Sequence, residues 1–388
     1  MPLGVFLSGG LDSSAIAALA ANVRTSDVHN IDGNNFGTSD VPRLITLSII
    51  FDEPEFSEEY YSDLVAKKID SDHRKIKITK QDFYDSFNDI FEAMDQPTID
   101  GVNTFFIAKA AKQAGLKTVL SGLGSDEIFC GYPGFRRAEL LRKIQQMPKF
   151  IKLPLFNYPI TQLLNYLTKN DRYSKLSYFT NNDILSFYLG IRGLFAPQEA
   201  AKILDIDEKE VNDFIINMGK SDLPRGSTSQ ILTANSQEVE PRQINPVNLL
   251  SYLELKFYLQ NQLLKDTDFM SMHHSVEVRV PFLDYPLVEY LSSLPPEVKL
   301  NMGKSDFPKL NKSLLVAAVH DLLPPEILTR KKMGFTFPFQ RWFKELSKIP
   351  NSPSSEAELL RRTGKFQIPH SKSHWSRFWA KVVLERFK

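Results

Sequence analysis

The chain has 388 residues, of which 42% are hydrophobic and 24% charged, and a formal net charge of +1 at pH 7. This composition is typical of a globular protein, and the length predicts two domains or one domain with a large extension. The low net charge argues against a nucleic-acid partner, no apolar stretch approaches the length of a membrane span, and the single cysteine fits a reducing compartment. We therefore expect a cytoplasmic protein with no nucleic-acid or membrane partner.

The first informative element is an apolar strand at residues 4–7 that turns through two glycines into a helix beginning with hydroxyl residues. Glycines let backbone N–H groups approach an anion, and the amides and dipole at a helix N-terminus attract negative charge. No Lys-Ser or Lys-Thr pair follows, which favours a loop for pyrophosphate over one that grips the β and γ phosphates. The candidate contacts are Ser8, Gly9, Gly10, Ser13 and Ser14. A helix start that Ser8 or Asp12 merely caps is the alternative.

Strands and helices then alternate along the chain. A helix with an apolar face ends near Val23, and a polar stretch at residues 24–43 predicts a mobile loop. The next predicted elements are strands at 44–51 and 73–78 and helices at 58–69 and 81–94. This alternation is the order that a parallel α/β sheet requires.

A short strand at residues 117–120 leads into a second turn of glycines and hydroxyls, residues 121–127. Because parallel strands end at one edge of a sheet, both turns can face one nucleotide. Asp12 and Asp126 are then predicted ligands of Mg²⁺, which prefers one or two carboxylates together with phosphate oxygens and water. The alternative for Asp126 is an acid in the first turn of a helix, where the dipole stabilises it without any ligand.

Strand signals fade near residue 132. From there the apolar spacing is helical, and prolines divide the segments. We predict a nucleotide-binding α/β core over residues 1–132 and a mainly α-helical extension over residues 133–388. Within the extension, residues 221–242 are predicted to form a long loop and residues 249–264 a buried apolar helix.

Five segments, in this order, resemble the signatures of one family. They are Ser-Gly-Gly-Leu-Asp-Ser-Ser at 8–14, Asp-Gln-Pro at 95–97, Ser-Gly-Leu-Gly-Ser-Asp-Glu-Ile-Phe at 121–129, Met-Ser-Met at 270–272 leading to Glu-Val-Arg-Val-Pro-Phe-Leu-Asp at 277–284, and Arg-Lys-Lys at 330–332. Together they resemble the synthetase domain of glutamine-hydrolysing asparagine synthetases, within the ATP pyrophosphatase (PP-loop) superfamily. The first segment is common to that superfamily, whereas the segment at 277–284 is much more specific.

The resemblance implies an amide synthetase that uses ATP and Mg²⁺. In such an enzyme a carboxylate, most simply aspartate, attacks the α-phosphorus of ATP, and ammonia displaces AMP from the acyl adenylate. The resemblance places adenine at main-chain atoms near Leu7 and Ile49, and the ribose and α-phosphate near Ser121 and Gly122. It also places the ammonium of Lys332 at the reacting phosphate. Two other functions stay open: amidation of a sugar-acid or peptide carboxylate, and a non-catalytic nucleotide-binding remnant or subunit.

The substrate side is expected within residues 256–340. Glu277 and Arg279 alternate with valines, so both charges point the same way from an extended segment. They bind the amino and carboxyl groups of aspartate or, equally, form a buried ion pair at the domain junction. Asp268 is a further substrate-side candidate. Leu123 departs from the tyrosine of β-lactam-forming relatives, and because an apolar side chain cannot act as a base, that cyclising activity is disfavoured.

Complete members of the family carry an N-terminal glutaminase domain whose first residue after methionine is a nucleophilic cysteine, and Pro2 stands here. We therefore expect the glutaminase half to be absent, with ammonia taken free or from a separate glutaminase partner. The one thiol, Cys130, is expected to pack in the interior. Phe269 stands where an arginine is common in the family, which could alter the choice of substrate.

Overall fold

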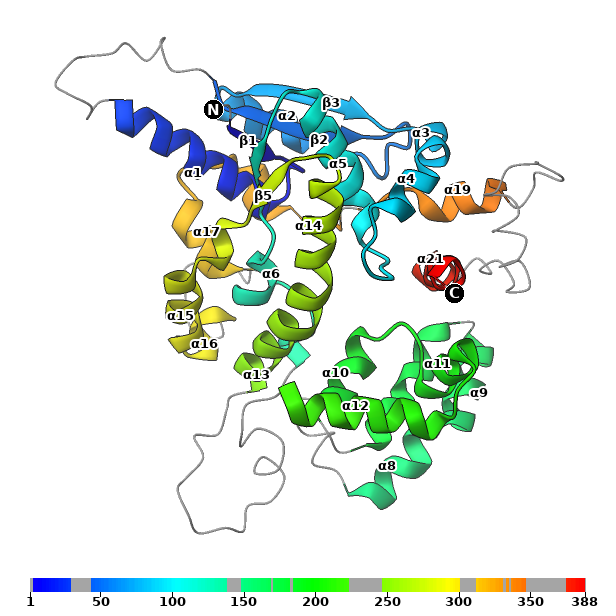
Figure 1. Cartoon of the computed structure of the whole chain (residues 1–388). Helices are drawn as coiled ribbons and strands as arrows, with labels where there is room; N and C mark the ends of the chain where they lie inside the picture. Colours follow the sequence, from blue (N-terminus) through cyan, green and yellow to red (C-terminus); the bar gives the residue numbers. More distant parts are fainter. Residues whose placement is uncertain are drawn as a thin grey trace. The chain divides into compact units, whose positions relative to one another are not determined.

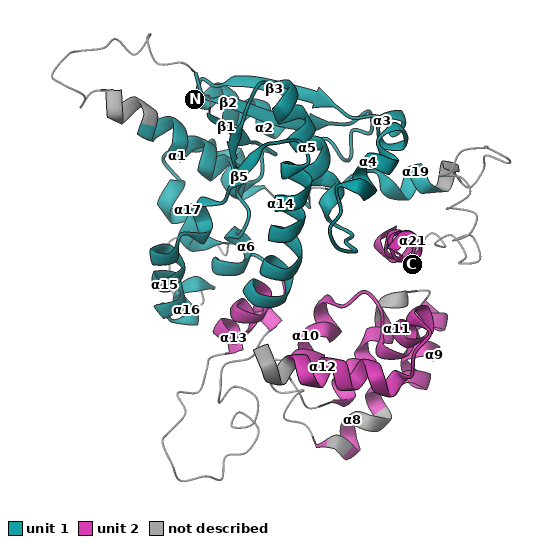
Figure 2. Cartoon of the chain, in the orientation of Figure 1, with its two compact units in different colours: residues 1–131, 255–357 teal, residues 132–254, 358–388 magenta. Residues whose placement is uncertain are grey.

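The structure is a computed structural model that describes residues 3–28, 43–137, 148–168, 170–181, 184–222, 246–300, 312–330, 333–334, 336–346 and 375–387. The chain divides into two compact units, coloured separately in Figure 2: unit 1 is residues 1–131 with 255–357, and unit 2 is residues 132–254 with 358–388. The first break lies beside the boundary predicted at residue 132. The chain from residue 255 to 357, however, belongs with the core rather than with the helical part.

Unit 1 is built on a parallel sheet of five strands in the order β3-β2-β1-β4-β5 (Figure 1). The strands are β1 Leu3–Phe6, β2 Ile45–Ile50, β3 Asp72–Lys77, β4 Thr118–Leu120 and β5 Glu277–Arg279. The central strand is β1, in which Val5 lies opposite Thr46 of β2 and Leu120 of β4. The predicted parallel α/β core is therefore confirmed. The carboxyl ends of β1 and β4 are neighbours, which brings the two turns that follow them to one stretch of the sheet edge.

Unit 1 also contains many helices and one short 3-10 turn. They are α1 Leu11–Val28, α2 Glu59–Lys68, α3 Lys80–Asp85, α4 Phe87–Glu92, α5 Gly101–Gln113, α6 Ser125–Ile128, α14 Leu264–Met272, the short 3-10 turn η5 Pro281–Leu283, α15 Tyr285–Ser293, α16 Pro296–Lys299, α17 Ser313–Val319, α18 Pro325–Thr329 and α19 Phe339–Leu346.

Two predicted helix boundaries in unit 1 are wrong. The first helix continues past Val23 to Val28, because residues 24–28 contain no glycine or proline to stop it. The rest of the polar stretch, residues 29–42, lies outside the described residues. The helix predicted at 81–94 is two helices, α3 and α4. The backbone of Ser86 leaves the helical region, so that α3 ends and α4 begins at this residue.

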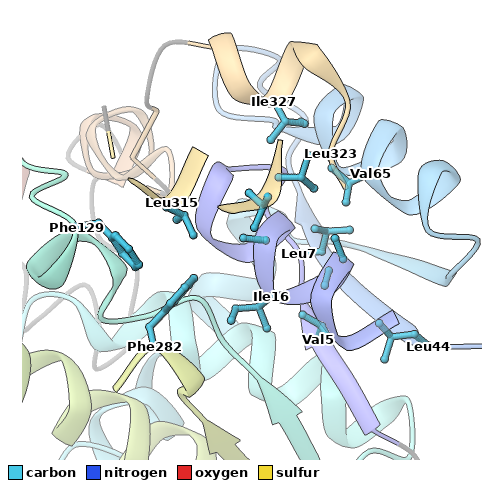
Figure 3. Packing of buried hydrophobic residues seen from close by; sticks show 14 of the residues in the cluster. Val5, Leu7, Ile16, Leu44, Val65, Phe129, Phe282, Leu315, Leu323 and Ile327 are labelled. Atoms are coloured by element: carbon cyan, nitrogen blue, oxygen red, sulfur yellow. The ribbon is translucent and has the colours of Figure 1, made fainter. Parts of the chain in front are cut away.

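A buried apolar cluster fixes the first turn of the chain. Apolar side chains of β1 and α1, among them Val5, Leu7 and Ile16, pack with Leu315 of α17 and Ile327 of α18. Figure 3 shows these late helices beside α1. Each buried side chain of this size contributes on the order of 1.5–3 kcal/mol, so the helices after residue 312 hold the turn at residues 8–14 in position.

Unit 2 is helical and contains none of the residues predicted for the site. Its elements are η2 Phe135–Arg137, α8 Lys149–Phe156, α9 Tyr158–Thr168, the 3-10 segment η3 Asp171–Thr180, α10 Ile184–Arg192, α11 Pro197–Leu204, α12 Glu208–Asp222, α13 Pro246–Leu253 and α21 Trp375–Phe387. Within the described ranges of both units, we find no helix with the length and apolarity needed to cross a bilayer.

The segment predicted as one buried helix at 249–264 differs from that expectation. The α-helix α13 is followed by a π-helix, η4 Glu254–Leu263, and much of η4 is only half-buried. The predicted loop at 221–242 lies, apart from the end of α12, outside the described residues. Cys130 is buried, as predicted.

Candidate functional site

The turn between β1 and α1 is closed by its own serines. The Ser8 N–H donates to Oγ of Ser13 at 3.1 Å, the Gly10 N–H donates to Oγ of Ser8 at 3.3 Å, and the Ser13 hydroxyl donates to the Gly10 carbonyl at 3.2 Å. Gly9 has φ +73°, and a Cβ there would lie 2.6 Å from the backbone nitrogen of Ser62. Only glycine fits this position. The result is a compact turn with two hydroxyls 3.1 Å apart.

The second turn packs directly against the first. A Cβ on Gly122 would lie 2.7 Å from the carbonyl carbon of Asp12 and 2.8 Å from the nitrogen of Ser13. The Ser125 hydroxyl donates to Oδ1 of Asp12 at 2.8 Å. The structure therefore brings the turns at residues 8–14 and 121–127 together at the carboxyl edge of the sheet.

A lysine that the sequence analysis did not identify lies between the two predicted metal ligands. The Lys312 ammonium is 2.5 Å from Oδ1 of Asp12 and 2.7 Å from Oδ1 of Asp126, and it donates to Oγ of Ser125 at 3.2 Å. Burial lowers the pKa of Lys312, but the charges and hydrogen bonds of Asp12 and Asp126 outweigh that effect, so the pKa is raised overall and the side chain stays an ammonium.

The Asp12 and Asp126 carboxylates suit a magnesium ion. One oxygen from each lies within hydrogen-bond distance of a single cationic atom, so the two carboxylates converge on one cation position. Two carboxylates with phosphate oxygens and water are the ligands that Mg²⁺ prefers. The donor set therefore fits the predicted metal.

The residues expected near adenine are buried: Ile49 lies in β2, and Leu7 directly follows β1. Leu7 is 1% exposed, its N–H donates to the Leu47 carbonyl at 2.8 Å, and its own carbonyl accepts from the Ser48 hydroxyl. Ile49 lies opposite Ile76 within the β2–β3 ladder. A nucleotide contact at Leu7 would therefore use the second lone pair of a carbonyl that Ser48 already orients.

Two serines complete the predicted nucleotide set. Ser14 is fully buried, and its hydroxyl has no hydrogen-bond partner among the described residues. The Ser121 N–H donates to the Arg279 carbonyl at 2.9 Å, while its Oγ accepts from the Leu123 N–H at 3.4 Å. Ser121 thus joins the second turn to β5, the edge strand that carries the predicted substrate residues.

The predicted substrate residues are exposed. Nε of Arg279 lies 2.9 Å from Oε1 of Glu277, and their side chains are 63% and 55% exposed. A buried ion pair, one of the two interpretations of these charges, is therefore wrong. Asp268 is also exposed, whereas Asp266, two residues earlier on α14, is buried and accepts a hydrogen bond from the Thr98 hydroxyl.

Arg330 ties a late segment of the chain to the first turn. Its Nη1 donates to the Gly9 carbonyl at 2.8 Å, its Nη2 donates to Oε1 of Glu58 at 2.6 Å, and the guanidinium lies 3.9 Å from the ring centre of Tyr61. By holding the Gly9 carbonyl, Arg330 fixes the path of the turn. Lys332, the predicted catalytic lysine, lies outside the described residues, two positions after this anchor.

Comparison with known proteins finds relatives over most of the chain. The chain is 27% identical over 346 residues to "Asparagine synthetase [glutamine-hydrolyzing] 1" of Bacillus subtilis, covering 89% of this chain and 48% of the relative. It is 28% identical to a "Putative asparagine synthetase [glutamine-hydrolyzing]" of Mycobacterium tuberculosis, covering 88% of this chain and 46% of the relative. It is 24% identical to "Amidase chry2" of Gibberella zeae, covering 88% of this chain and 50% of the relative.

The chain thus spans about half the length of the curated relatives it matches. The sequence model described as "Asparagine synthase" matches residues 1–374, nearly the whole chain. Together with the two converging turns, that match shows that the chain belongs to the asparagine synthase family.

Proposed function

We propose that the chain is an ATP-dependent, AMP-forming amide synthetase that converts aspartate to asparagine with ammonia. The observation that carries the proposal is the convergence of Asp12 and Asp126, from two glycine-containing turns, on one cation position at the sheet edge. Membership of the asparagine synthase family supports the reaction class. The cytoplasm is the proposed compartment.

In the first step a carboxylate oxygen attacks the α-phosphorus of ATP, the bond from that phosphorus to the bridging oxygen breaks, and pyrophosphate leaves. Negative charge grows on the departing pyrophosphate, and the first turn would stabilise it through its amides and hydroxyls. The contacts assigned to it are Ser8, Gly9, Gly10, Ser13 and Ser14. Magnesium held by Asp12 and Asp126 would neutralise phosphate charge. Lys332 is assigned to the reacting phosphate.

In the second step the ammonia lone pair attacks the acyl carbon, the bond to AMP breaks, and the new amide loses a proton to water or another base. Arg279 is assigned to a substrate carboxylate, because a guanidinium binds carboxylates in a bidentate manner. Glu277 is assigned to the substrate amino group. Both are accessible from solvent, and the Arg279 carbonyl is bonded to Ser121 at the nucleotide edge. Asp268 remains a weaker substrate candidate.

A second candidate function is amidation of a different carboxylate, such as a sugar acid or a peptide. Two relatives that match 88% of this chain, from Gibberella zeae and Penicillium rubens, are named amidases rather than asparagine synthetases. The Glu277–Arg279 pair is exposed, so both charges are accessible to a carboxylate substrate of either kind. In both cases the adenylating half of the reaction is the same.

The test is to incubate the purified chain with ATP, Mg²⁺, ammonium and aspartate and to follow pyrophosphate, AMP and asparagine. All three products are expected. Pyrophosphate without asparagine points to another carboxylate, to be found with a panel of sugar acids and peptides. If ATP is not cleaved with any of the acids tested, both functions are contradicted, and a non-catalytic nucleotide-binding subunit is favoured.

The ammonia source needs a separate measurement, in which glutamine replaces ammonium. Turnover with ammonium alone is expected from the isolated chain. Turnover with glutamine that depends on an added glutaminase would support a separate partner as the ammonia source.

A further inference from the structure

The cation position between Asp12 and Asp126 is taken by a side chain of the protein itself. Both carboxylates contribute their Oδ1 atom to the Lys312 ammonium, at 2.5 Å and 2.7 Å. The side chain of Lys312 is 4% exposed, whereas those of Asp12 and Asp126 are 28% and 18% exposed. The two acids are therefore partly accessible to a ligand, whereas the ammonium that they share is buried.

The ammonium is confined in this position. Lys312 directly precedes α17 and has φ +56°, and the helix residues Leu315, Val316 and Val319 are buried, so its backbone is held by the core. On the other side lies Gly131, where a Cβ would stand 2.2 Å from Cε of Lys312 and 2.0 Å from Oδ1 of Asp126. A left-handed backbone in a residue other than glycine persists only where the surroundings enforce it. The lysine has little space to withdraw.

The formal charges of the two acids and the lysine determine which ligand can bind between them. Asp12, Asp126 and Lys312 together carry a net charge of −1. A divalent cation that arrived alone would meet an ammonium already occupying the attractive point, and at such short range repulsion between like charges is strong. A metal that arrives bound to a triphosphate brings compensating negative charge, which the ammonium attracts.

We propose that Lys312 prevents the Asp12–Asp126 pair from binding a divalent cation until a nucleoside triphosphate is present, so that metal and nucleotide enter together. The order of binding is then fixed by the protein's own cation. This inference rests on the proposed function only in taking a triphosphate as the ligand of the two turns.

The test measures binding of Mn²⁺, as a spectroscopic substitute for Mg²⁺, to the full chain without nucleotide, by the electron paramagnetic resonance signal of the free ion. The variant is Lys312→Met, which keeps the length of the side chain and removes its charge. The matched control is Lys75→Met, since Lys75 also bridges two carboxylates, Glu59 at 2.8 Å and Asp63 at 3.1 Å, but near the surface. Thermal melts establish that each variant folds.

The Lys312→Met variant is expected to bind one Mn²⁺ at least about tenfold more tightly than the wild type, and Lys75→Met to match the wild type. Adding Asp12→Asn to Lys312→Met should abolish the new site. Equal Mn²⁺ affinity of the folded wild type and Lys312→Met overturns the inference, as does a gain that survives Asp12→Asn.

The experiment distinguishes failure of this inference from failure of the proposed function. If the wild type forms pyrophosphate but Lys312→Met gains no Mn²⁺ affinity, the inference falls and the function stands. If Lys312→Met gains the Asp12-dependent site but the wild type cleaves no ATP, the charge arrangement stands and the proposed reaction falls.

Discussion

Unit 1 contains two clusters of acidic side chains that are stabilised in different ways. Asp12 and Asp126 share the Lys312 ammonium. Asp266 accepts from the Thr98 hydroxyl, and the groups that shift its pKa beside burial are Thr98, Asp100 and Gln96, none of them a cation. Burial raises the pKa of Asp266 to about 7, and the Asp100 charge adds to that effect.

The difference lies in what each cluster contacts. Asp12 and Asp126 are half-buried and share one cation. Asp266 is buried with neutral donors and a second acid nearby, and it holds its proton to near-neutral pH. The first cluster therefore suits polyanion and metal chemistry, while the second suits a structural contact between α14 and the segment before α5.

The ion pair between Glu58 and Arg330 is expected to give the largest change in stability. Both side chains are only 7% exposed, and the Arg330 guanidinium neutralises the Glu58 carboxylate. Burial raises the pKa of Glu58, and the Arg330 charge opposes that shift. Arg330→Met should lower the free energy of unfolding by about 3–5 kcal/mol, because it leaves a buried charge unpaired. Denaturant unfolding measures this.

The control is Arg74→Met, which removes the cation of the half-exposed Arg74–Asp72 ion pair. It should lower the free energy of unfolding by at most about 1 kcal/mol. Adding Glu58→Gln to Arg330→Met should restore much of the loss. Equal costs for Arg330→Met and Arg74→Met would show that burial does not distinguish the two pairs.

Asp12→Asn tests the acidic pair that holds Lys312. Removal of one carboxylate should slow pyrophosphate formation by about 100- to 1,000-fold, the range found when a group that stabilises transition-state charge is lost. The control is Asp63→Asn, which removes a carboxylate from the comparable but exposed Lys75 cluster. A folded Asp12→Asn variant with the wild-type rate would contradict the assignment of this site.

Asp266→Asn tests the cluster without a cation through pH. The folded-state pKa of about 7 lies above the value of an unfolded aspartate, so the native protein binds more protons and loses stability as pH rises from about 4 to 7. The asparagine variant avoids that loss. Its advantage in unfolding free energy should be near zero at pH 4 and reach about 4 kcal/mol above pH 7.

The difference between variant and wild type is the quantity to plot, because His274 has the opposite slope. Burial lowers the pKa of His274 to about 4, so this group adds stability as pH rises from about 4 to 6.5. A difference between Asp266→Asn and wild type that does not change with pH would show that Asp266 is ionised throughout.

The Glu277–Arg279 pair gives the smallest expected effect on stability. Because the pair is exposed, replacing both residues with glutamine should leave the unfolding free energy nearly unchanged. The KM for aspartate should nevertheless rise, since the proposal assigns both groups to the substrate. An unchanged KM at unchanged stability would remove them from the site.

The sequence predicted the parts of the site whose signals are local. Glycines and hydroxyls after two apolar strands marked both turns, and the parallel sheet brought Asp12 and Asp126 together as expected. Lys312 carries no such mark, and Arg330 was noted only as part of a family signature, without its contact to the first turn. Their partners lie 300 and 321 positions away along the chain, and nothing in the neighbouring residues distinguishes a buried lysine from a solvated one.

The fold shows the same division between local and distant causes. Alternating strands and helices predicted the core, and apolar spacing located strands β1 to β4 and helices α1 and α2, but few of the helices after residue 132. The π-helical backbone of η4 was not predictable in this way, because its register depends on tertiary contacts. The side chain of Gln96, for example, donates to the Asn261 carbonyl at 2.8 Å, and Gln262 donates to Asp100 at 2.6 Å.

The place of β5 in the sheet has a consequence for synthesis on the ribosome. Its partner β4 ends at Leu120, and all of residues 121–276 are made before β5 can pair with it. Until then β4 is an open edge, the kind of backbone that recruits strands from other chains. We therefore expect nascent chains that end before residue 277 to aggregate unless a chaperone covers that edge. Chains that include β5 should aggregate less, because β5 then pairs with β4.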